Sequence, residues 1–194
     1  GAKLALVASP FIALALLLIG LTLWVSWQLD GGAAALNEAG RMRMQTFRLS
    51  LSVSTDDRDA VARGLRQFDD SLALLRQGDP NRPLFMPWDD ETRPRLEAVE
   101  ADWKRFRERW TTQPTPPLTT LGEETGAFAN RIDGLVTAVE AHLSRWTAML
   151  HLLQAAMMAL AVLGSAALLY TGYLYVLQPV DLLKRAIERL QGGD

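Results

Sequence analysis

The sequence predicts an all-α fold: two transmembrane helices with a periplasmic up-down antiparallel four-helix bundle between them, assembled as a dimer. Two uncharged apolar segments, residues 4–27 and 152–179, lie near the ends of the 194-residue chain. Between them, apolar residues recur at spacings of three and four, the period of helices that face a core. No segment alternates apolar and polar residues as a half-exposed strand does.

Each apolar segment is long enough to cross a hydrocarbon core of about 30 Å. The first is about twice as long as the apolar part of a signal peptide, and no small-residue cleavage site follows it. Lys3 precedes the first segment, and three basic residues between 184 and 189 follow the second. Because positive charge favours the cytoplasmic side, both termini are expected there, in a two-pass protein of a bacterial inner membrane. The expected division is a first transmembrane helix at 1–27, a periplasmic domain at 28–150, a second transmembrane helix at 151–178 and a cytoplasmic segment at 179–194.

Composition and motifs exclude several classes of function. The chain has 20 Lys and Arg against 22 Asp and Glu, which does not indicate binding to nucleic acid. It has no cysteine, so disulfides and thiolate sites are excluded. His142 has no partner at metal-ligand spacing, and the acidic pairs such as Asp69-Asp70 are typical of solvated faces. With no nucleophile elbow, phosphate loop or kinase signature, we expect no catalytic residue, metal or cofactor in this part of the protein.

The two inner helices of the bundle are predicted by their apolar stripes and by the breakers around them. The breakers are "GDPNRPLFMP" at 78–87 and "TTQPTPP" at 111–117, and the run from Ser54 to Asp57 offers capping side chains where the first helix must turn. The two stripes are Val61, Leu65, Phe68, Leu72 and Leu75, and Leu96, Val99, Trp103, Phe106 and Trp110.

The last helix carries the longest periodic pattern in the chain. Its predicted heptad register runs from Leu121 to Leu177 without a break, which predicts one rod from the bundle through the membrane. The positions are Leu121, Thr125, Phe128, Ile132, Leu135, Val139, His142, Trp146, Met149, Leu153, Ala156, Leu160, Leu163, Ala167, Tyr170, Leu174 and Leu177.

Arg43 is the residue of the first helix that calls for an explanation. On a helical wheel it shares a stripe of apolar and small residues with Leu36, Gly40 and Phe47, whereas Arg41 and Arg48 point to the opposite side. No acidic residue lies three or four positions from Arg43, so no ion pair within the helix is available. A buried guanidinium without a partner costs several kcal/mol, so an anion must meet it.

Two sources of that anion are open. One is a carboxylate of another helix, such as Glu97, Glu100 or Glu140. The other is a small exogenous anion held by the planar guanidinium beside the bare backbone of Gly40. A two-fold axis along this stripe would bring two copies of Arg43 together, and an anion between them would then join the protomers.

The segment "NEAGRMRMQTFRL" at 37–49 resembles the P-box of nitrate/nitrite sensor histidine kinases of the NarX/NarQ type. The shared positions are Asn37, Ala39, Gly40, Arg43, Met44, Gln45, Thr46, Phe47, Arg48 and Leu49. The segment "FANRIDGLVTAVE" at 128–140 is similar, less closely, to a second periplasmic stretch of that family. The resemblance implies a homodimer that binds one nitrate or nitrite through Arg43 and Gly40 of both protomers, with Ala39, Met44 and Phe47 lining the site.

The segment after the second apolar stretch is similar to the first helix of a HAMP linker, the coiled-coil module that follows transmembrane helices in bacterial receptors. Pro179 stands at the membrane exit, and Val180, Leu183 and Ile187 follow at coiled-coil spacing. We expect these four residues to transmit the signal.

The resemblance therefore implies a periplasmic nitrate sensor that signals through its membrane helices to a cytoplasmic histidine kinase and its response regulator. Two alternatives stay open. Chemotaxis transducers of the pili type carry a related, looser motif. A ligand-free membrane interaction module would keep Arg43 in an internal salt bridge.

Overall fold

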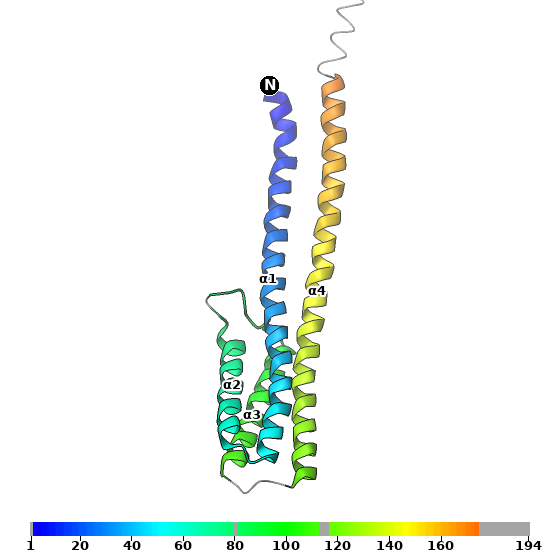
Figure 1. The fold of residues 1–194 in the computed structure, drawn as a ribbon. Helices are drawn as coiled ribbons and strands as arrows, with labels where there is room; N and C mark the ends of the chain where they lie inside the picture. The colour runs from blue at the N-terminus through cyan, green and yellow to red at the C-terminus, as the bar shows by residue number, and fades with distance from the viewer. Residues whose placement is uncertain (1, 80, 113–116, 175–194) are drawn as a thin grey trace, which may run out of the picture. The chain divides into compact units, whose positions relative to one another are not determined.

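The computed structural model describes residues 2–79, 81–112 and 117–174. Four helices account for nearly all of them: α1 (Ala2–Ser54), α2 (Arg58–Gln77), α3 (Thr92–Thr112) and α4 (Leu118–Gly172) (Figure 1). Within these described ranges there is no strand, and the only pairing of that kind is an isolated bridge between Asp79 and Leu84. The predicted all-α architecture with four helices is confirmed.

The chain divides into two units, which we describe separately. The first comprises residues 25–148 and contains α2, α3 and the adjoining parts of α1 and α4. The second comprises the first 24 residues and the chain from residue 149 onward.

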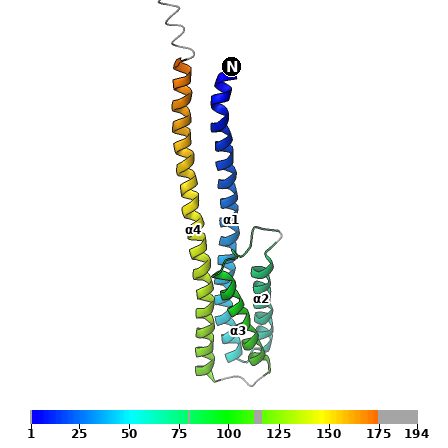
Figure 2. The same cartoon turned by 180° about the vertical axis from the view of Figure 1, so that it is seen from behind.

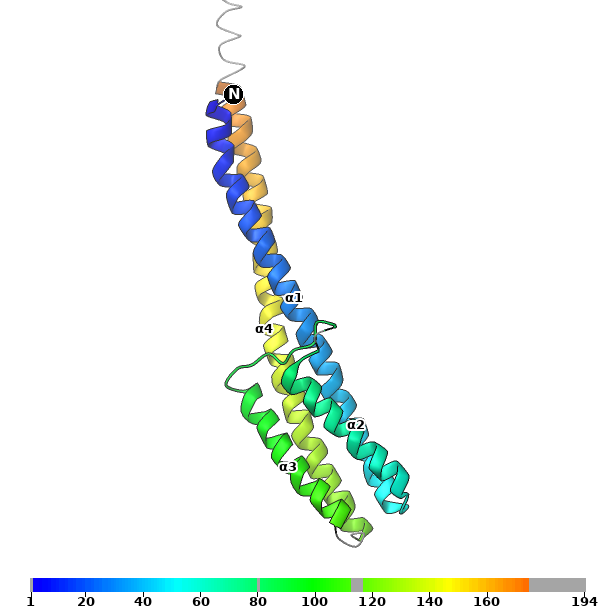
Figure 3. The same cartoon turned by 90° about the vertical axis from the view of Figure 1, so that its left-hand side faces the viewer.

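In the first unit, four helices lie side by side in a bundle (Figures 2 and 3). Each neighbouring pair is joined by at least one polar contact. Gln45 on α1 bonds to Ser71 on α2, and Asp69 on α2 accepts a hydrogen bond from the indole of Trp103 on α3. Asp102 on α3 pairs with Arg131 on α4, and Thr125 on α4 bonds to Ser50 on α1, which closes the ring of helices.

Apolar side chains fill the bundle where the sequence predicts them. Leu65, Phe68, Leu72 and Leu75 of α2 are buried, as are Leu96, Val99, Trp103 and Trp110 of α3 and Leu121, Phe128, Ile132, Leu135 and Val139 of α4. Aromatic rings occupy the centre: Phe68 stacks on Trp103 with centroids 4.0 Å apart, and Phe128, which is 1% exposed, contacts both. Dense ring packing of this kind is a large share of the stabilisation of a small bundle.

The turn between α1 and α2 uses the capping residues that the sequence offers. Asp56 adopts a positive φ of 51°, which reverses the chain. The carboxylate of Asp57 then accepts a hydrogen bond from the backbone N–H of Ala60 at 2.9 Å, so it caps the first turn of α2.

In the second unit, α1 and α4 pack against each other along a narrow seam. A Cβ built on Gly164 would lie 3.3 Å from the ring of Phe11, so the absence of a side chain lets the helices approach closely. Both helices are long and apolar enough to cross a membrane, judged by length and composition.

The predicted register is half right in this part of α4: the predicted positions Leu153, Leu160, Ala167 and Leu174 are half-buried, whereas the positions that alternate with them are not. Met149, Ala156, Leu163 and Tyr170 are exposed, and the positions one residue later, Leu150, Met157, Gly164 and Thr171, are buried or half-buried. The reason is that this segment has no charged residue and is apolar almost all round, so its apolar periodicity does not identify the face that packs on α1. The four residues predicted to transmit the signal, Pro179, Val180, Leu183 and Ile187, lie outside the described residues, as does Leu177.

Candidate functional site

The motif segment of α1 presents two different faces. Ala35, Ala39, Met42, Thr46, Leu49 and Val53 form the buried one. The stripe predicted from the wheel, which contains Gly40, Arg43 and Phe47, is exposed or only partly covered. Ala39 is therefore a core residue and not a lining residue of the predicted site. The buried face needs close helix approach, which its two alanines allow.

Arg43 is paired within its own chain. Its Nη1 donates to Oδ1 of Asp133 on α4 at 2.9 Å, and the two side chains are 52% and 43% exposed. In the single chain Arg43 is thus half exposed and not buried. Its partner is a carboxylate of another helix, one of the two expected sources, but it is Asp133 and none of Glu97, Glu100 and Glu140. Asp133 lies in residues 128–140, the second segment for which the sequence shows a family resemblance. Its place in that segment could have predicted it as the partner of Arg43.

A hollow surrounds this pair on the outside of the bundle. It has a volume of about 560 Å³ and is lined by Leu36, Asn37, Gly40, Arg41, Arg43, Met44, Asp133 and Val136. A Cβ on Gly40 would meet no atom within 4 Å, so the backbone at this position is open to a ligand or to another chain. The structure therefore brings together Gly40, Arg43 and Met44 of the predicted site, and adds Arg41 and Asp133.

An exposed apolar face adjoins this hollow. Met44, Phe47 and Leu51 of α1 are 58%, 50% and 65% exposed. With Gly40 they recur at spacings of four, three and four, the pattern of a helix that packs against another helix. Phe47 does not line the hollow itself.

Glu38 is a buried carboxylate on the inward face of α1. It is 2% exposed, accepts a hydrogen bond from Ser71 at 2.7 Å, and lies 3.6 Å from Arg41. Glu38 lies one helical turn after Ala35, on the same inward face, and this spacing could have predicted its burial. Because Ser71 also contacts Gln45, this network fixes α1 against α2 beside the hollow.

His142 belongs to a second polar cluster, where α4 meets the segment before α3. The indole N–H of Trp146 donates to Nε2 of His142, so the imidazole proton lies on Nδ1 and is donated to Asp89 at 2.7 Å. Arg145 also contacts this carboxylate, at 3.1 Å. Burial raises the pKa of Asp89, but hydrogen bonds from Thr92 and His142 outweigh it and hold the pKa well below the ordinary 3.8.

The described part of the chain contains no group of three or more His, Asp or Glu side chains that could hold a metal ion. The polar clusters above are ion pairs and hydrogen bonds between helices.

A family model described as the type IV pili methyl-accepting chemotaxis transducer N-terminal domain (PilJ) matches residues 24–124. The chain belongs to this family. The PilJ family is a periplasmic sensor domain of signal transducers. The matched range contains the motif at 37–49 and ends before the second stretch at 128–140. No curated protein matches the chain.

Membership in the PilJ family gives the bundle a general role as a sensor, and two apolar helices fit a membrane protein. Membership in the PilJ family does not place the chain among the nitrate/nitrite sensor kinases that its motif resembles. The chain is thus a helical sensor domain of a transmembrane signal transducer.

Proposed function

We propose that this chain is the sensory and membrane-spanning part of a chemotaxis-type transducer. The match to the PilJ family carries the proposal, because it covers the bundle from residue 24 to residue 124. The bundle receives the stimulus in the periplasm, and α1 and α4, which continue into the two apolar segments, pass it to the cytoplasm.

A pair of fusions tests this function. The chain is joined after residue 194 to the methyl-accepting output region of a chemotaxis receptor, and separately to a histidine-kinase core. We expect the first fusion to change the swimming bias of cells on addition of nitrate, and a control lacking residues 28–148 not to respond. If nitrate changed only the phosphorylation of the kinase fusion, and not the swimming bias, the result would instead favour a two-component sensor that acts on a response regulator.

Topology is tested on the same protein. Alkaline phosphatase inserted after Gln77 should be active, because it would fold in the periplasm, whereas the same enzyme attached after residue 194 should be inactive. The reverse pattern would contradict the orientation proposed from the flanking charges.

A small anion such as nitrate or nitrite is the second element of the proposal, and the hollow at Arg43 supports it. Arg43 uses one of its five N–H donors on Asp133, Arg41 lines the same hollow, and Gly40 leaves the backbone open. The hollow is far larger than a nitrate ion. We therefore propose that a second copy of the chain completes the site, with the face of Met44, Phe47 and Leu51 against its own equivalent.

Calorimetry of the full chain in detergent with nitrate tests the anion site. Arg43→Ala should abolish binding, and Arg48→Ala should retain it, because Arg48 does not line this hollow. Asp133→Asn should bind nitrate more tightly than the wild type, since it removes a competing negative charge. Unchanged binding by the Arg43 variant would place the anion elsewhere.

Cross-linking tests the dimer. The chain has no cysteine, so Phe47→Cys introduces a single thiol. We expect this variant to form a disulfide-linked dimer in membranes, and a matched variant, Arg66→Cys on the exposed side of α2, to stay monomeric under the same oxidation. Equal dimer yields from both positions would reject this interface.

A further inference from the structure

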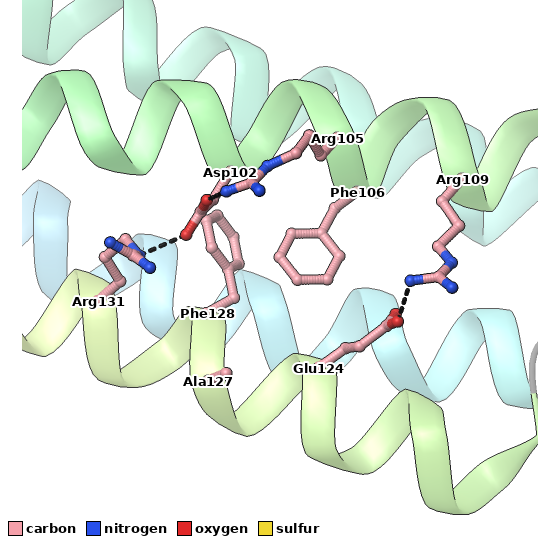
Figure 4. A pocket seen from close by; sticks show the side chains of 8 residues that line it. All are labelled: Asp102, Arg105, Phe106, Arg109, Glu124, Ala127, Phe128 and Arg131. Carbon is pink, nitrogen blue, oxygen red and sulfur yellow. Dashed lines mark hydrogen bonds and ion pairs between the residues drawn. The ribbon is translucent and has the colours of Figure 1, made fainter.

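A second cavity lies between α3 and α4, away from Arg43. Its volume is about 230 Å³. Figure 4 shows two charged groups at its ends, Asp102 with Arg105 and Arg131 at one end and Arg109 with Glu124 at the other. The ring of Phe106 lies between them. The cavity is thus apolar in the middle and charged at both ends.

The arginines keep most of their hydrogen-bonding capacity. Asp102, which is 7% exposed, is the shared partner of Arg105 and Arg131, and Arg109 pairs with Glu124. The three arginine side chains are 75%, 51% and 48% exposed in the order Arg105, Arg131 and Arg109. A guanidinium has five donors, so each retains N–H groups for a further acceptor. Three cations face two carboxylates, which leaves one positive charge in excess.

Glu124 is incompletely satisfied. Its Oε1 accepts from Arg109, whereas its Oε2 is buried and has no hydrogen-bond partner among the described residues. A buried acceptor without a donor destabilises the folded protein. Ion pairs that only fastened α3 to α4 would need neither the cavity nor this free acceptor. A ligand that brings a donor satisfies Oε2 once the Glu124 side chain turns toward the cavity.

We propose that this cavity binds an α-amino acid with an acidic side chain, of which L-glutamate is the probe we would use. The α-carboxylate accepts from Arg109, and the α-ammonium donates to the Glu124 carboxylate, whose side chain turns to bring the buried Oε2 into the cavity. The aliphatic chain lies on Phe106, and the side-chain carboxylate meets Arg105 and Arg131 at the far end.

The spacing and charge of the cavity favour this ligand class. Asp102 and Arg109 are seven residues apart on α3, about 10 Å along the helix. Extended glutamate covers much of this separation, and the flexible arms of Arg105 and Arg131 cover the rest. Its single net negative charge neutralises the excess positive charge of the site. A basic side chain would instead meet two guanidinium groups, so L-lysine should bind much more weakly.

This inference goes beyond the proposed function, because the cavity between α3 and α4 is separate from the hollow at Arg43. Ligand binding to this cavity is measured without any signalling output. Isothermal calorimetry of the full chain in detergent with L-glutamate is the direct experiment. Two analogues separate the contributions of the ligand: glutarate lacks the ammonium group, and γ-aminobutyrate lacks the α-carboxylate. We expect L-glutamate to bind, and each analogue to bind at least about tenfold more weakly, as for the loss of a charge-assisted hydrogen bond.

Variants of the protein locate the binding. Glu124→Gln and Arg105→Gln should each weaken L-glutamate binding about tenfold or more. Arg105 is highly exposed, so its variant should keep the fold, and circular dichroism verifies this. Arg66→Gln on α2 is the matched control and should not change the affinity. Absence of L-glutamate binding by folded wild-type protein, or equal binding of glutarate, would overturn the proposal, as would equal affinities of the Glu124 and Arg66 variants.

Discussion

The side chains of Arg43 and Asp133 form an ion pair, and each of them is about half exposed. This exposure limits what the pair contributes to the stability of the protein. An exposed pair of this kind stabilises a protein by roughly 0–1 kcal/mol because water screens it. Arg43→Ala should therefore change the free energy of unfolding by less than about 1 kcal/mol. Chemical denaturation followed by circular dichroism measures this. A much larger loss would mean that Arg43 holds the fold, and its loss of anion binding could then not be assigned to the site.

Asp89 gives the bundle a specific dependence on pH. A carboxyl whose pKa is lower in the folded protein contributes stability above its ordinary pKa and loses it as the pH falls toward the folded value. For Asp89, stabilisation is therefore complete at neutral pH and declines below about pH 4. Asp89 also accepts a hydrogen bond from the backbone N–H of Thr92, the first residue of α3, at 2.7 Å. Asp89→Ala should therefore cost at least about 1 kcal/mol at pH 7, the typical effect of losing a cap to a helix.

The decisive measurement for Asp89 is the difference in unfolding free energy between wild type and Asp89→Ala as a function of pH. The difference should shrink as the pH is lowered from 5 to 3. Asp57→Ala serves as the comparison, since Asp57 caps α2 without a histidine or arginine partner in the described structure. A difference for Asp89 that grew on acidification would contradict the assigned direction of the pKa.

Two glycines of α1 distinguish its packed face from its open face. A Cβ on Gly31 would overlap the ring of Phe85, which also packs against Trp27 with ring centroids 4.7 Å apart. Gly31→Ala should therefore destabilise the bundle by about 1–3 kcal/mol, the range for overpacking. Gly40→Ala meets no neighbour and should stabilise the isolated chain by up to about 1 kcal/mol through higher helix propensity.

Thermal unfolding of the two glycine variants in detergent, below the concentration at which the chain associates, tests this contrast. Destabilisation by Gly40→Ala under those conditions would show that this face is already covered within a single chain.

The helices differ in how much of their packing can be predicted from the sequence. In α2 and α3 one face is apolar and the other charged, so periodicity identified Phe68 and Trp103 as core residues. In α1 the inward face with Met42 and the outward face with Phe47 are both apolar or small, so periodicity does not choose between them. The partner of Arg43 depends on how α1 pairs with α4, and single-sequence spacing does not contain that information.

In the second unit, the seam between α1 and α4 is the place where movement of one helix against the other can be measured. Phe11 lies against Gly164, and in an antiparallel pair this register places Ala15 opposite Leu160, both of them half-buried. We predict that ligand binding in the periplasm slides α1 against α4 along this seam, because packed helices shift between discrete arrangements and do not bend continuously. Cysteines at Ala15 and Leu160 should then form a disulfide at different rates with and without nitrate.

The pair Leu16 and Leu163 is the control for this experiment, since these side chains are 64% and 63% exposed and point away from the seam. The chain has no native cysteine, so the engineered pair alone reports the motion. Offsets of the second cysteine by three and four residues along α4 give the direction of the slide, because a displaced helix brings a neighbouring turn opposite Ala15. If every offset cross-links at the same rate with and without ligand, sliding is excluded, and the signal must pass by rotation of the helices or by a change in the distance between protomers.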